Sequence, residues 1–250
     1  MQNKSVALVT GANKGIGLQI AKDLTTHGFT VLVGSRNFEN GEIAAKSIEA
    51  DAHAIQLDVT NQTSIAAAAE RIRNEFGRLD VLVNNAAISH VPRPGAPFEE
   101  KMAAGRPSVV PIDEVRAVFE TNVFGVMAVT QAMLPLLREA PAARIVNVSS
   151  EVGSLTMQTD KSNPYYGIQN GAYVPSKTAL NAITVAFAKE LEGTPIKVNM
   201  ACPGYTATDL NDFHGTRTVE QGAHEPVRLA LLDENGPTGT FSNEDGPLSW

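Results

Sequence analysis

Val6-Ala-Leu-Val-Thr-Gly-Ala-Asn-Lys-Gly-Ile-Gly17 is the stretch of sequence that decides the fold. The residues from Ser5 to Thr10 form a short apolar run that predicts a buried strand. After the glycines, Ile16, Ile20 and Leu24 recur at helical spacing, and Gly28 is expected to stop this helix. A strand, a glycine-rich turn and a helix in this order predict a dinucleotide site, because backbone N–H groups can approach a pyrophosphate where Cβ atoms are missing.

The glycine spacing alone is weak evidence for such a site. It reads Gly-x-x-x-Gly-x-Gly, which differs from the Gly-x-Gly-x-x-Gly fingerprint, and many helices simply begin at a glycine-rich turn. The second predicted strand, Thr30 to Ser35, ends in Ser35-Arg36, where a site that selects NAD would carry Asp or Glu. Arg36 can accommodate a 2′-phosphate and Lys14 could add a second cation, so we favour NADP over NAD. The alternative is that Arg36 is an ordinary exposed arginine in a loop.

Strand-like and helical segments continue to alternate along the chain. The sequence therefore predicts an α/β fold, with one doubly wound (Rossmann) domain over residues 1–250, a mostly parallel sheet of about seven strands, and helices on both faces. Ser89 to Val110, rich in proline and glycine, is the least regular segment and is expected to be a functional or a mobile loop. The remaining predicted strands are His53–Leu57, Leu79–Val83, Arg144–Val148, Ile196–Ala201 and Thr238–Phe241, and the helices Glu39–Ala50, Asn61–Gly77, Ile112–Arg138, Tyr173–Leu191 and Val219–Leu232.

Composition restricts the classes of function. The 250 residues are 43% hydrophobic and carry a net charge of −7, which suits a large core and disfavours nucleic acid or an anionic membrane as a partner. A single cysteine, Cys202, allows no internal disulfide and no cysteine-based zinc site, and the five histidines show no paired ligand spacing, so no metal is expected. Met1 to Lys4 is too short for a signal peptide, and no apolar run of membrane-spanning length is apparent. We therefore expect a soluble, cytoplasmic protein.

Tyr173 and Lys177 carry the strongest chemical signal. They open a helical segment in which Leu180, Ile183 and Phe187 recur, so residues four apart share one face. A neighbouring ammonium favours phenolate, and we expect Lys177 to lower the pKa of Tyr173 from about 10 and make it a usable general acid. The alternative is a tyrosine ring that packs on a lysine stem. Of the four tyrosines, only Tyr173 has a lysine four residues later.

Three further polar residues follow or interrupt apolar patterns. Asp58 ends a predicted strand, where it could reach an adenine amino group or simply cap a turn. Asn122 falls on the apolar stripe of its helix and is either a hydrogen-bond clip in the core or part of a site, because a buried amide needs partners. Ser150 follows the strand Arg144–Val148, and ligands of open parallel sheets bind outside such strand ends.

Together these residues resemble the short-chain dehydrogenase/reductase family over nearly the whole chain. Asn13-Lys14 and Ser35-Arg36 make the sequence most similar to the NADPH-dependent carbonyl reductases within that family. The resemblance implies that Tyr173 is the general acid toward the substrate oxygen and that Lys177 holds the nicotinamide ribose. The elements that carry the resemblance, in family order, are Thr10-Gly11-x-x-x-Gly15-Ile16-Gly17, Asp58, Asn84-Asn85-Ala86-Ala87, Asn122, Ser150, Tyr173-x-x-x-Lys177 and Pro203-Gly204.

The resemblance also implies roles for the other site residues. Ser150 would hydrogen-bond the substrate oxygen, and Asn122 would position a water in the proton path behind Lys177. Ala87 stands where the family usually has glycine, a change of one methyl that we expect to be tolerated. The cofactor NADP(H) would be bound by Gly11, Asn13, Lys14, Gly15, Ile16, Gly17, Arg36, Asp58, Val59, Asn85, Ala86, Tyr173, Lys177, Pro203, Gly204, Thr206 and Thr208.

The predicted activity is reversible reduction of ketones or aldehydes to alcohols. A regulatory protein that binds NADP(H) without turnover is the main alternative, and an epimerase or dehydratase on the same scaffold is a third. The gap from Ser150 to Tyr173 is longer than in the commonest members of the family, which favours a monomer or homodimer over a tetramer. Residues that suggest an apolar or aromatic substrate, although each could equally belong to the core, are Ile88, Val91, Tyr165, Tyr166, Tyr205 and Phe213.

Overall fold

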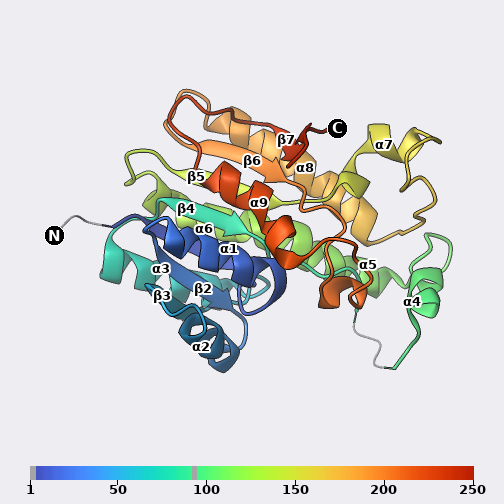
Figure 1. The fold of residues 1–250 in the computed structure, drawn as a ribbon, viewed down its shortest axis with the longest axis horizontal. Helices are drawn as coiled ribbons and strands as arrows, with labels where there is room; N and C mark the ends of the chain where they lie inside the picture. The colour runs from blue at the N-terminus through green and yellow to red at the C-terminus, as the bar shows by residue number, and fades with distance from the viewer. Residues whose placement is uncertain (1–3, 92–94) are drawn as a thin grey trace.

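The computed structural model describes residues 4–91 and 95–250, so Met1 to Asn3 and residues 92–94 of the predicted loop lie outside the described part. The strands form one sheet in the order β3-β2-β1-β4-β5-β6-β7-β8 (Figure 1). Each neighbouring pair is parallel except β7 and β8, where the chain folds back on itself. The strands are β1 (Val6–Thr10), β2 (Thr30–Ser35), β3 (Ala52–Gln56), β4 (Val81–Asn84), β5 (Arg144–Val148), β6 (Lys197–Ala201), β7 (Phe241–Asn243) and β8 (Gly246–Pro247).

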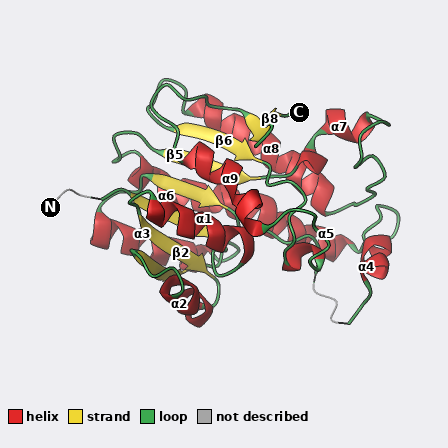
Figure 2. Cartoon of the chain, viewed as in Figure 1, coloured by secondary structure: helices red, strands yellow, loops and turns green. Residues whose placement is uncertain are grey.

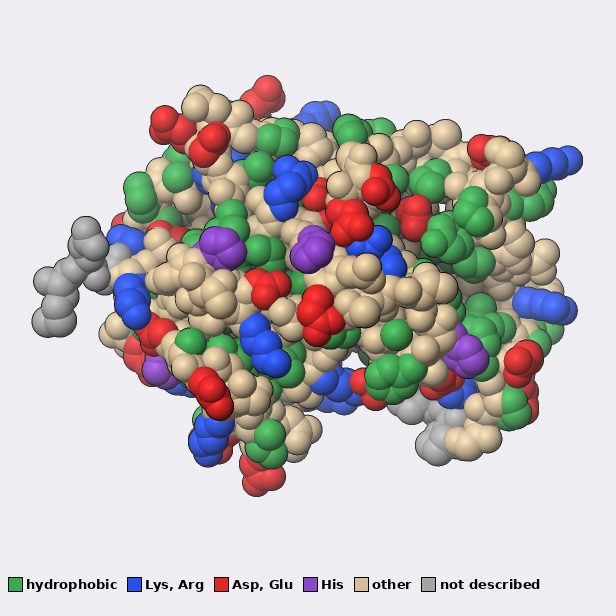
Figure 3. Space-filling view, viewed as in Figure 1, with side chains coloured by type: hydrophobic (Ala, Val, Ile, Leu, Met, Phe, Trp, Pro, Cys, Tyr) green, Lys and Arg blue, Asp and Glu red, His purple; other side chains and the backbone are tan. Residues whose placement is uncertain are grey.

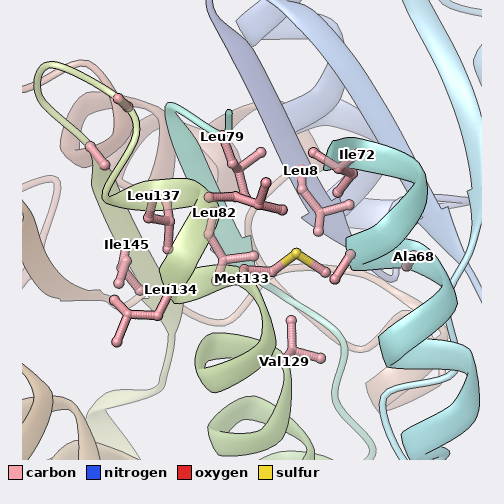
Figure 4. Close-up of a cluster of buried hydrophobic side chains, with 14 of the residues drawn as sticks. Leu8, Ala68, Ile72, Leu79, Leu82, Val129, Met133, Leu134, Leu137 and Ile145 are labelled. Atoms are coloured by element: carbon pink, nitrogen blue, oxygen red, sulfur yellow. The ribbon is translucent and has the colours of Figure 1, made fainter. Parts of the chain in front are cut away.

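Helices cover both faces of the sheet (Figure 2). Alternate strand residues face opposite sides, so Leu8 and Leu82 point to one layer while Val9 and Val83 point to the other. The first layer contains α3 (Gln62–Phe76), α6 (Val126–Leu137) and α8 (Tyr173–Glu190), and Figure 4 shows Met133 of α6 beside Leu8 and Leu82. The second contains α1 (Gly15–Thr26), α2 (Phe38–Lys46) and α9 (Val219–Ala230). This arrangement confirms the doubly wound α/β fold.

Several predicted boundaries need correction. The bounds of β2 and β5 are as predicted, whereas β4 begins two residues later and α2 ends at Lys46 rather than Ala50. The last predicted strand, Thr238–Phe241, is shifted to Phe241–Asn243. Thr238 Oγ1 accepts from Val198 N and Asn199 Oδ1 accepts from Thr240 N, so side-chain bonds alternate with the backbone bonds Gly239 N to Val198 O and Met200 N to Thr240 O. The sheet has eight strands instead of about seven because of the two-residue β8.

The predicted helix Ile112–Arg138 is not continuous. It is built from α5 (Ile112–Phe119), a π-helical turn η1 (Glu120–Gly125) and α6. By length and composition the run Ile112–Leu137 could cross a membrane, which corrects the expectation that no such run exists. Half of its most apolar window is buried inside the fold, as in a core helix.

The segment predicted to be irregular between Ser89 and Val110 contains a short helix, α4 (Phe98–Ala104). The connection before α8 also contains a 3-10 turn η2 (Glu151–Gly153) and a short helix α7 (Leu155–Thr159), and a second 3-10 turn η3 (Asp209–Asn211) follows β6. In Figure 1 both α4 and α7 lie beyond the same end of the sheet. On the face drawn in Figure 3, acidic and basic side chains are interspersed rather than gathered by sign.

Candidate active site

The predicted site residues converge on the carboxyl ends of four neighbouring strands. The glycine turn follows β1, Asn85-Ala86 follows β4, Ser150 follows β5 and Pro203-Gly204 follows β6. The strand order reverses between β1 and β4, which is the position where open parallel sheets bind ligands. The topology therefore assembles at one edge what the sequence spreads over the whole chain.

The glycine turn is held tightly by the residues after β4. Gly11 has a φ of +63°, and a Cβ atom there would lie 2.9 Å from Cα of Ala86. Asn85 Nδ2 donates to the carbonyls of Thr10 at 2.9 Å and Gly11 at 3.2 Å. Asn85 thus fixes the turn, and Gly11 could not be replaced by a larger residue without moving Ala86.

The head of α1 fits an anion. Lys14 precedes the helix, no side chain caps this helix end in the described part of the chain, and the first turn contains no acidic residue. The first N–H groups of α1 are therefore open to a ligand. The side chains of Lys14 and Arg36 are exposed, and Lys14 Nζ lies 3.2 Å from Asp209 Oδ2 on the segment after β6. The residues present thus fit a phosphate-bearing cofactor.

The other predicted cofactor residues surround this turn. Asp58 Oδ1 accepts from Thr60 N and Thr60 Oγ1, so it caps a turn as the alternative reading of the sequence expected. Thr208 lies against the glycine turn, since a Cβ on Gly15 would lie 3.5 Å from its Cγ2. Thr206 is buried and donates to the carbonyl of Pro203, and Val59 is buried beside η1. Asn13 and Ile16 are half-buried within the turn.

Asn122, Ser150, Tyr173 and Lys177 come from three elements and meet at the first turn of α8. The Ser150 side chain interacts with the Tyr173 phenol and favours its ionised form. Lys177 Nζ lies 5.6 Å from the centre of the Tyr173 ring and donates to the carbonyl of Val148 at 2.8 Å. The phenol of Tyr173 and the ammonium of Lys177 thus lie side by side as predicted. The ammonium, however, donates its hydrogen bond to the carbonyl of Val148 at the end of β5 and not to the phenol.

The expected direction of the Tyr173 pKa shift is wrong. Burial raises the pKa of Tyr173 above its usual value of about 10, and the interaction with Ser150 opposes this only in part. Burial also lowers the pKa of Lys177 to about 8. Burial removes water from both the phenolate form of Tyr173 and the ammonium form of Lys177. The spacing of the two residues along a helix does not reveal this desolvation. The phenol consequently keeps its proton at neutral pH.

Asn122 is completely buried and is fixed by three hydrogen bonds. Its Oδ1 accepts from Ile88 N at 2.9 Å, while Nδ2 donates to Ile88 O at 2.8 Å and to Ser176 Oγ at 3.0 Å. Ser176 Oγ in turn donates to the carbonyl of Tyr173 at 2.6 Å. Asn122 is therefore the core clip that the sequence allowed, and it is joined to α8 through Ser176; its predicted role in positioning a water stays a prediction.

Two residues at this site were missed in the sequence. Ser176 lies inside the quoted Tyr-x-x-x-Lys segment, and Asn170 precedes it; Asn170 Oδ1 accepts from Tyr173 N at 2.6 Å. Asparagine just before a helical segment is a known capping signal and could have identified Asn170.

Cys202 is buried directly after β6. Its Sγ accepts from the N–H groups of Glu151 and Gly204, and burial raises the pKa of its thiol to about 11.

The residues predicted to line an apolar substrate site do not form one group. Ile88 packs in a small core cluster with Val110, Val118 and Ala172, so part of its surface belongs to the core. Tyr165 interacts with Glu151, which directly follows Ser150, and burial together with this carboxylate raises the pKa of Tyr165 to about 12. Val91, Tyr166 and Phe213 are exposed, and Tyr205 is half-buried.

Comparisons with known proteins agree with this geometry. The chain is 34% identical to (-)-isopiperitenone reductase of Mentha piperita, with 97% of each chain covered, and 31% identical to the NADPH carbonyl reductase 1 of Mus musculus, with 99% of each covered. A short chain dehydrogenase of Shigella flexneri, solved in complex with NADP, superposes with a TM-score of 0.80 at 26% identity and covers 96% of this chain and 97% of its own. The family model described as short chain dehydrogenase matches residues 5–218. The chain belongs to the short-chain dehydrogenase family.

Proposed function

We propose that this protein is an NADPH-dependent reductase that converts a ketone or aldehyde to an alcohol, reversibly, with Tyr173 as general acid. The observation that carries the proposal is the Tyr173 phenol, which interacts with Ser150 and lies beside Lys177, at the same sheet edge as the open head of α1. Reductases among the relatives and the NADP complex of the Shigella protein support the choice of reaction and cofactor.

Each part of NADPH has a group of residues in this site that would bind it. The pyrophosphate would lie at the N–H groups of Gly15 and Ile16, and the 2′-phosphate at Arg36 and Lys14. Lys177 would hold the nicotinamide ribose. When bound, NADPH supplies the hydride that reduces the carbonyl carbon.

Residues of the protein must stabilise the negative charge that develops on the carbonyl oxygen. Reduction turns this oxygen into an alkoxide, so a hydrogen-bond donor and an acid must face it. Ser150 and Tyr173 would both contact that oxygen, and Tyr173 would transfer its phenolic proton to it. The raised pKa of Tyr173 keeps this proton in place between turnovers, and the nearby Lys177 ammonium would stabilise the phenolate that forms.

We further propose one catalytic domain, a small apolar or aromatic carbonyl substrate, a cytoplasmic location, and a monomer or homodimer. The long connection from Ser150 to Tyr173, which contains α7, supports the last point because extra residues there would interfere with the pairing of helices between subunits. Sedimentation equilibrium of the full chain tests the proposed monomer or homodimer, and a tetramer would contradict this proposal.

The decisive experiment is Tyr173→Phe in the full chain, assayed with NADPH and a panel of ketones and aldehydes. Loss of the proton donor is expected to lower kcat by about 10² to 10⁴. NADPH binding, measured by quenching of protein fluorescence, is expected to stay within about twofold, because the phenol contributes little to the phosphate contacts. Near-normal turnover by this variant would refute the assignment.

A further inference from the structure

The head of α8 is held by a side chain outside the predicted catalytic group. Asn170 Oδ1 accepts from the backbone N–H groups of Ala172 at 2.9 Å and of Tyr173 at 2.6 Å. Ala172, which directly precedes the helix, provides no side-chain hydrogen bond to it. Asn170 therefore supplies the oxygen that the free N–H groups of this helix end require.

The backbone of Tyr173 is fixed on both of its polar atoms. Its N–H donates to Asn170 Oδ1, and its carbonyl accepts from Ser176 Oγ at 2.6 Å. Ser176 is itself completely buried and bonded to Asn122. The peptide groups on either side of the Tyr173 Cα atom are thus both held by side chains, and the phenol of the same residue interacts with Ser150.

Asn170 is in turn fixed by the segment that follows α4. Gly171 N donates to the carbonyl of Gly105 at 2.8 Å, and a Cβ atom on Gly105 would lie 3.0 Å from Asn170 Nδ2. A Cβ on Gly171 would lie 2.8 Å from Cα of Pro107, so the two segments touch backbone to backbone. The contact joins residues far apart in sequence and leaves the Asn170 amide little room to turn.

The other side of α4 is attached to the segment after β6. Lys101 Nζ lies 2.7 Å from Asp212 Oδ2, and the rings of Phe98 and His214 stack with centroids 4.3 Å apart. The short helix α4 therefore connects the residues that follow β6 with the residues that open α8 (Figure 1). Asn170 stands at the second of these junctions.

We propose that Asn170 is a positioning residue, which acts through the backbone of Tyr173 and places the phenol for proton transfer. The inference rests on the proposed role of Tyr173. Without the Asn170 oxygen, the first turn of α8 can change its backbone angles, and the phenol lies at the far end of a long side chain. A displacement of about 1 Å at a reacting group can cost roughly 10²-fold in rate.

The test compares Asn170→Ala, Asn170→Asp and Thr218→Ala in the full chain. Thr218 Oγ1 accepts from Gln221 N at the head of α9, so its removal costs a cap of the same kind, about 1 kcal/mol, away from the site. Asn170→Ala is expected to lower kcat about 10- to 100-fold with the NADPH dissociation constant within about twofold. Asn170→Asp keeps the acceptor and is expected to recover kcat to within about threefold, whereas Thr218→Ala keeps the parental kcat.

A second variant covers the case in which Asn170→Ala does not fold. Gly105→Ala keeps the asparagine at position 170, but its new Cβ atom would lie 3.0 Å from Asn170 Nδ2 and displace the amide group. We expect kcat to fall several-fold while the affinity for NADPH stays at the parental value. Parental kcat in the folded Asn170 and Gly105 variants would overturn the inference. Tyr173→Phe in the same assay separates the two proposals: if that variant retains turnover, the function is wrong, and if it is inactive while Asn170→Ala is fully active, only the positioning role is wrong.

Discussion

The two ends of the candidate cofactor site are built in opposite ways. At the reaction end, Asn122 and Ser176 are completely buried, Lys177 is 3% exposed, and each side chain has a partner in the protein. At the phosphate end, Arg36 is exposed and the Lys14 side chain is 62% exposed. Buried groups have fixed positions and shifted pKa values. Exposed charges attract a ligand through electrostatic interactions that salt screens. Changes at the first end should alter turnover, and changes at the second should alter cofactor affinity.

Lys177→Met tests the reaction end and should give the largest effect. Without the ammonium, the phenolate that forms on Tyr173 loses its nearby positive charge, and kcat is expected to fall about 10² to 10⁴-fold. Initial rates at saturating NADPH, followed at 340 nm, measure this. The comparison would break if the variant lost affinity for NADPH while its kcat stayed at the parental value.

The buried lysine should also be visible in the pH dependence of stability. Burial lowers the pKa of Lys177 to about 8 in the folded protein, against about 10.5 in the unfolded chain. Above pH 8 the unfolded chain binds the extra proton, so the free energy of unfolding must rise with pH from 8 toward 10. Between pH 7 and 9.5 the lysine is expected to contribute a rise of about 2 kcal/mol, at most about 1.4 kcal/mol per pH unit.

Urea unfolding of the parental protein and of Lys177→Met over this pH range isolates the contribution of the lysine. Other groups titrate equally in both chains, so the difference between the two free energies should move in favour of the parental protein as pH rises. A difference that does not change with pH would show that Lys177 keeps an ordinary pKa, and the contrast between the two ends would lose its main support.

Arg36→Ala tests the phosphate end, where a smaller effect is expected. Loss of one charge-assisted hydrogen bond to the 2′-phosphate should weaken NADPH about tenfold, leave NADH affinity nearly unchanged, and leave kcat near its parental value. Titration of both cofactors at low salt measures this preference. If NADPH and NADH weaken equally, Arg36 does not read the 2′-phosphate and the choice of NADP over NAD loses its basis.

The features that could be predicted from the sequence are those that depend on neighbouring residues along the chain. The fold class, the first turn of α8 and the bounds of β2 and β5 follow from local patterns, because apolar runs and period-3.6 repeats are visible within ten or twenty residues. The glycine turn was visible because its conformation excludes larger residues. Family membership followed from these elements in order, and the comparisons confirm it.

Features that depend on distant partners could not be predicted. The short helix α4 is attached through Lys101 to Asp212, 111 residues later, and no local pattern announces such a contact. The π-helical turn at Glu120–Gly125 differs from an α-helix by less than apolar spacing can resolve. The raised pKa of Tyr173 results first from its burial, and the four-residue spacing of Tyr173 and Lys177 contains no information on burial.

Asp209→Asn should give the smallest effect, and in the opposite direction. Lys14 Nζ lies 3.2 Å from Asp209 Oδ2, an exposed ion pair across the mouth of the glycine turn, so Asp209 competes with a phosphate for the same cation. Exposed pairs are worth about 0.2 to 1 kcal/mol, so its removal should tighten NADPH up to about fivefold at low ionic strength. The gain should disappear at about 0.5 M salt because screening weakens both competitors.

Asp113→Asn is the matched control, since Asp113 forms an exposed pair with Arg116 on α5 and its loss changes the net charge by the same amount. If both variants tighten NADPH equally, the effect belongs to the overall charge and not to Lys14. The same change in a Lys14→Ala background completes the cycle: Asp209→Asn should then have no effect, because the cation for which the carboxylate competes is gone. A persistent gain there would mean that Asp209 repels the phosphate directly, and the phosphate end would then be governed by net charge rather than by one released lysine.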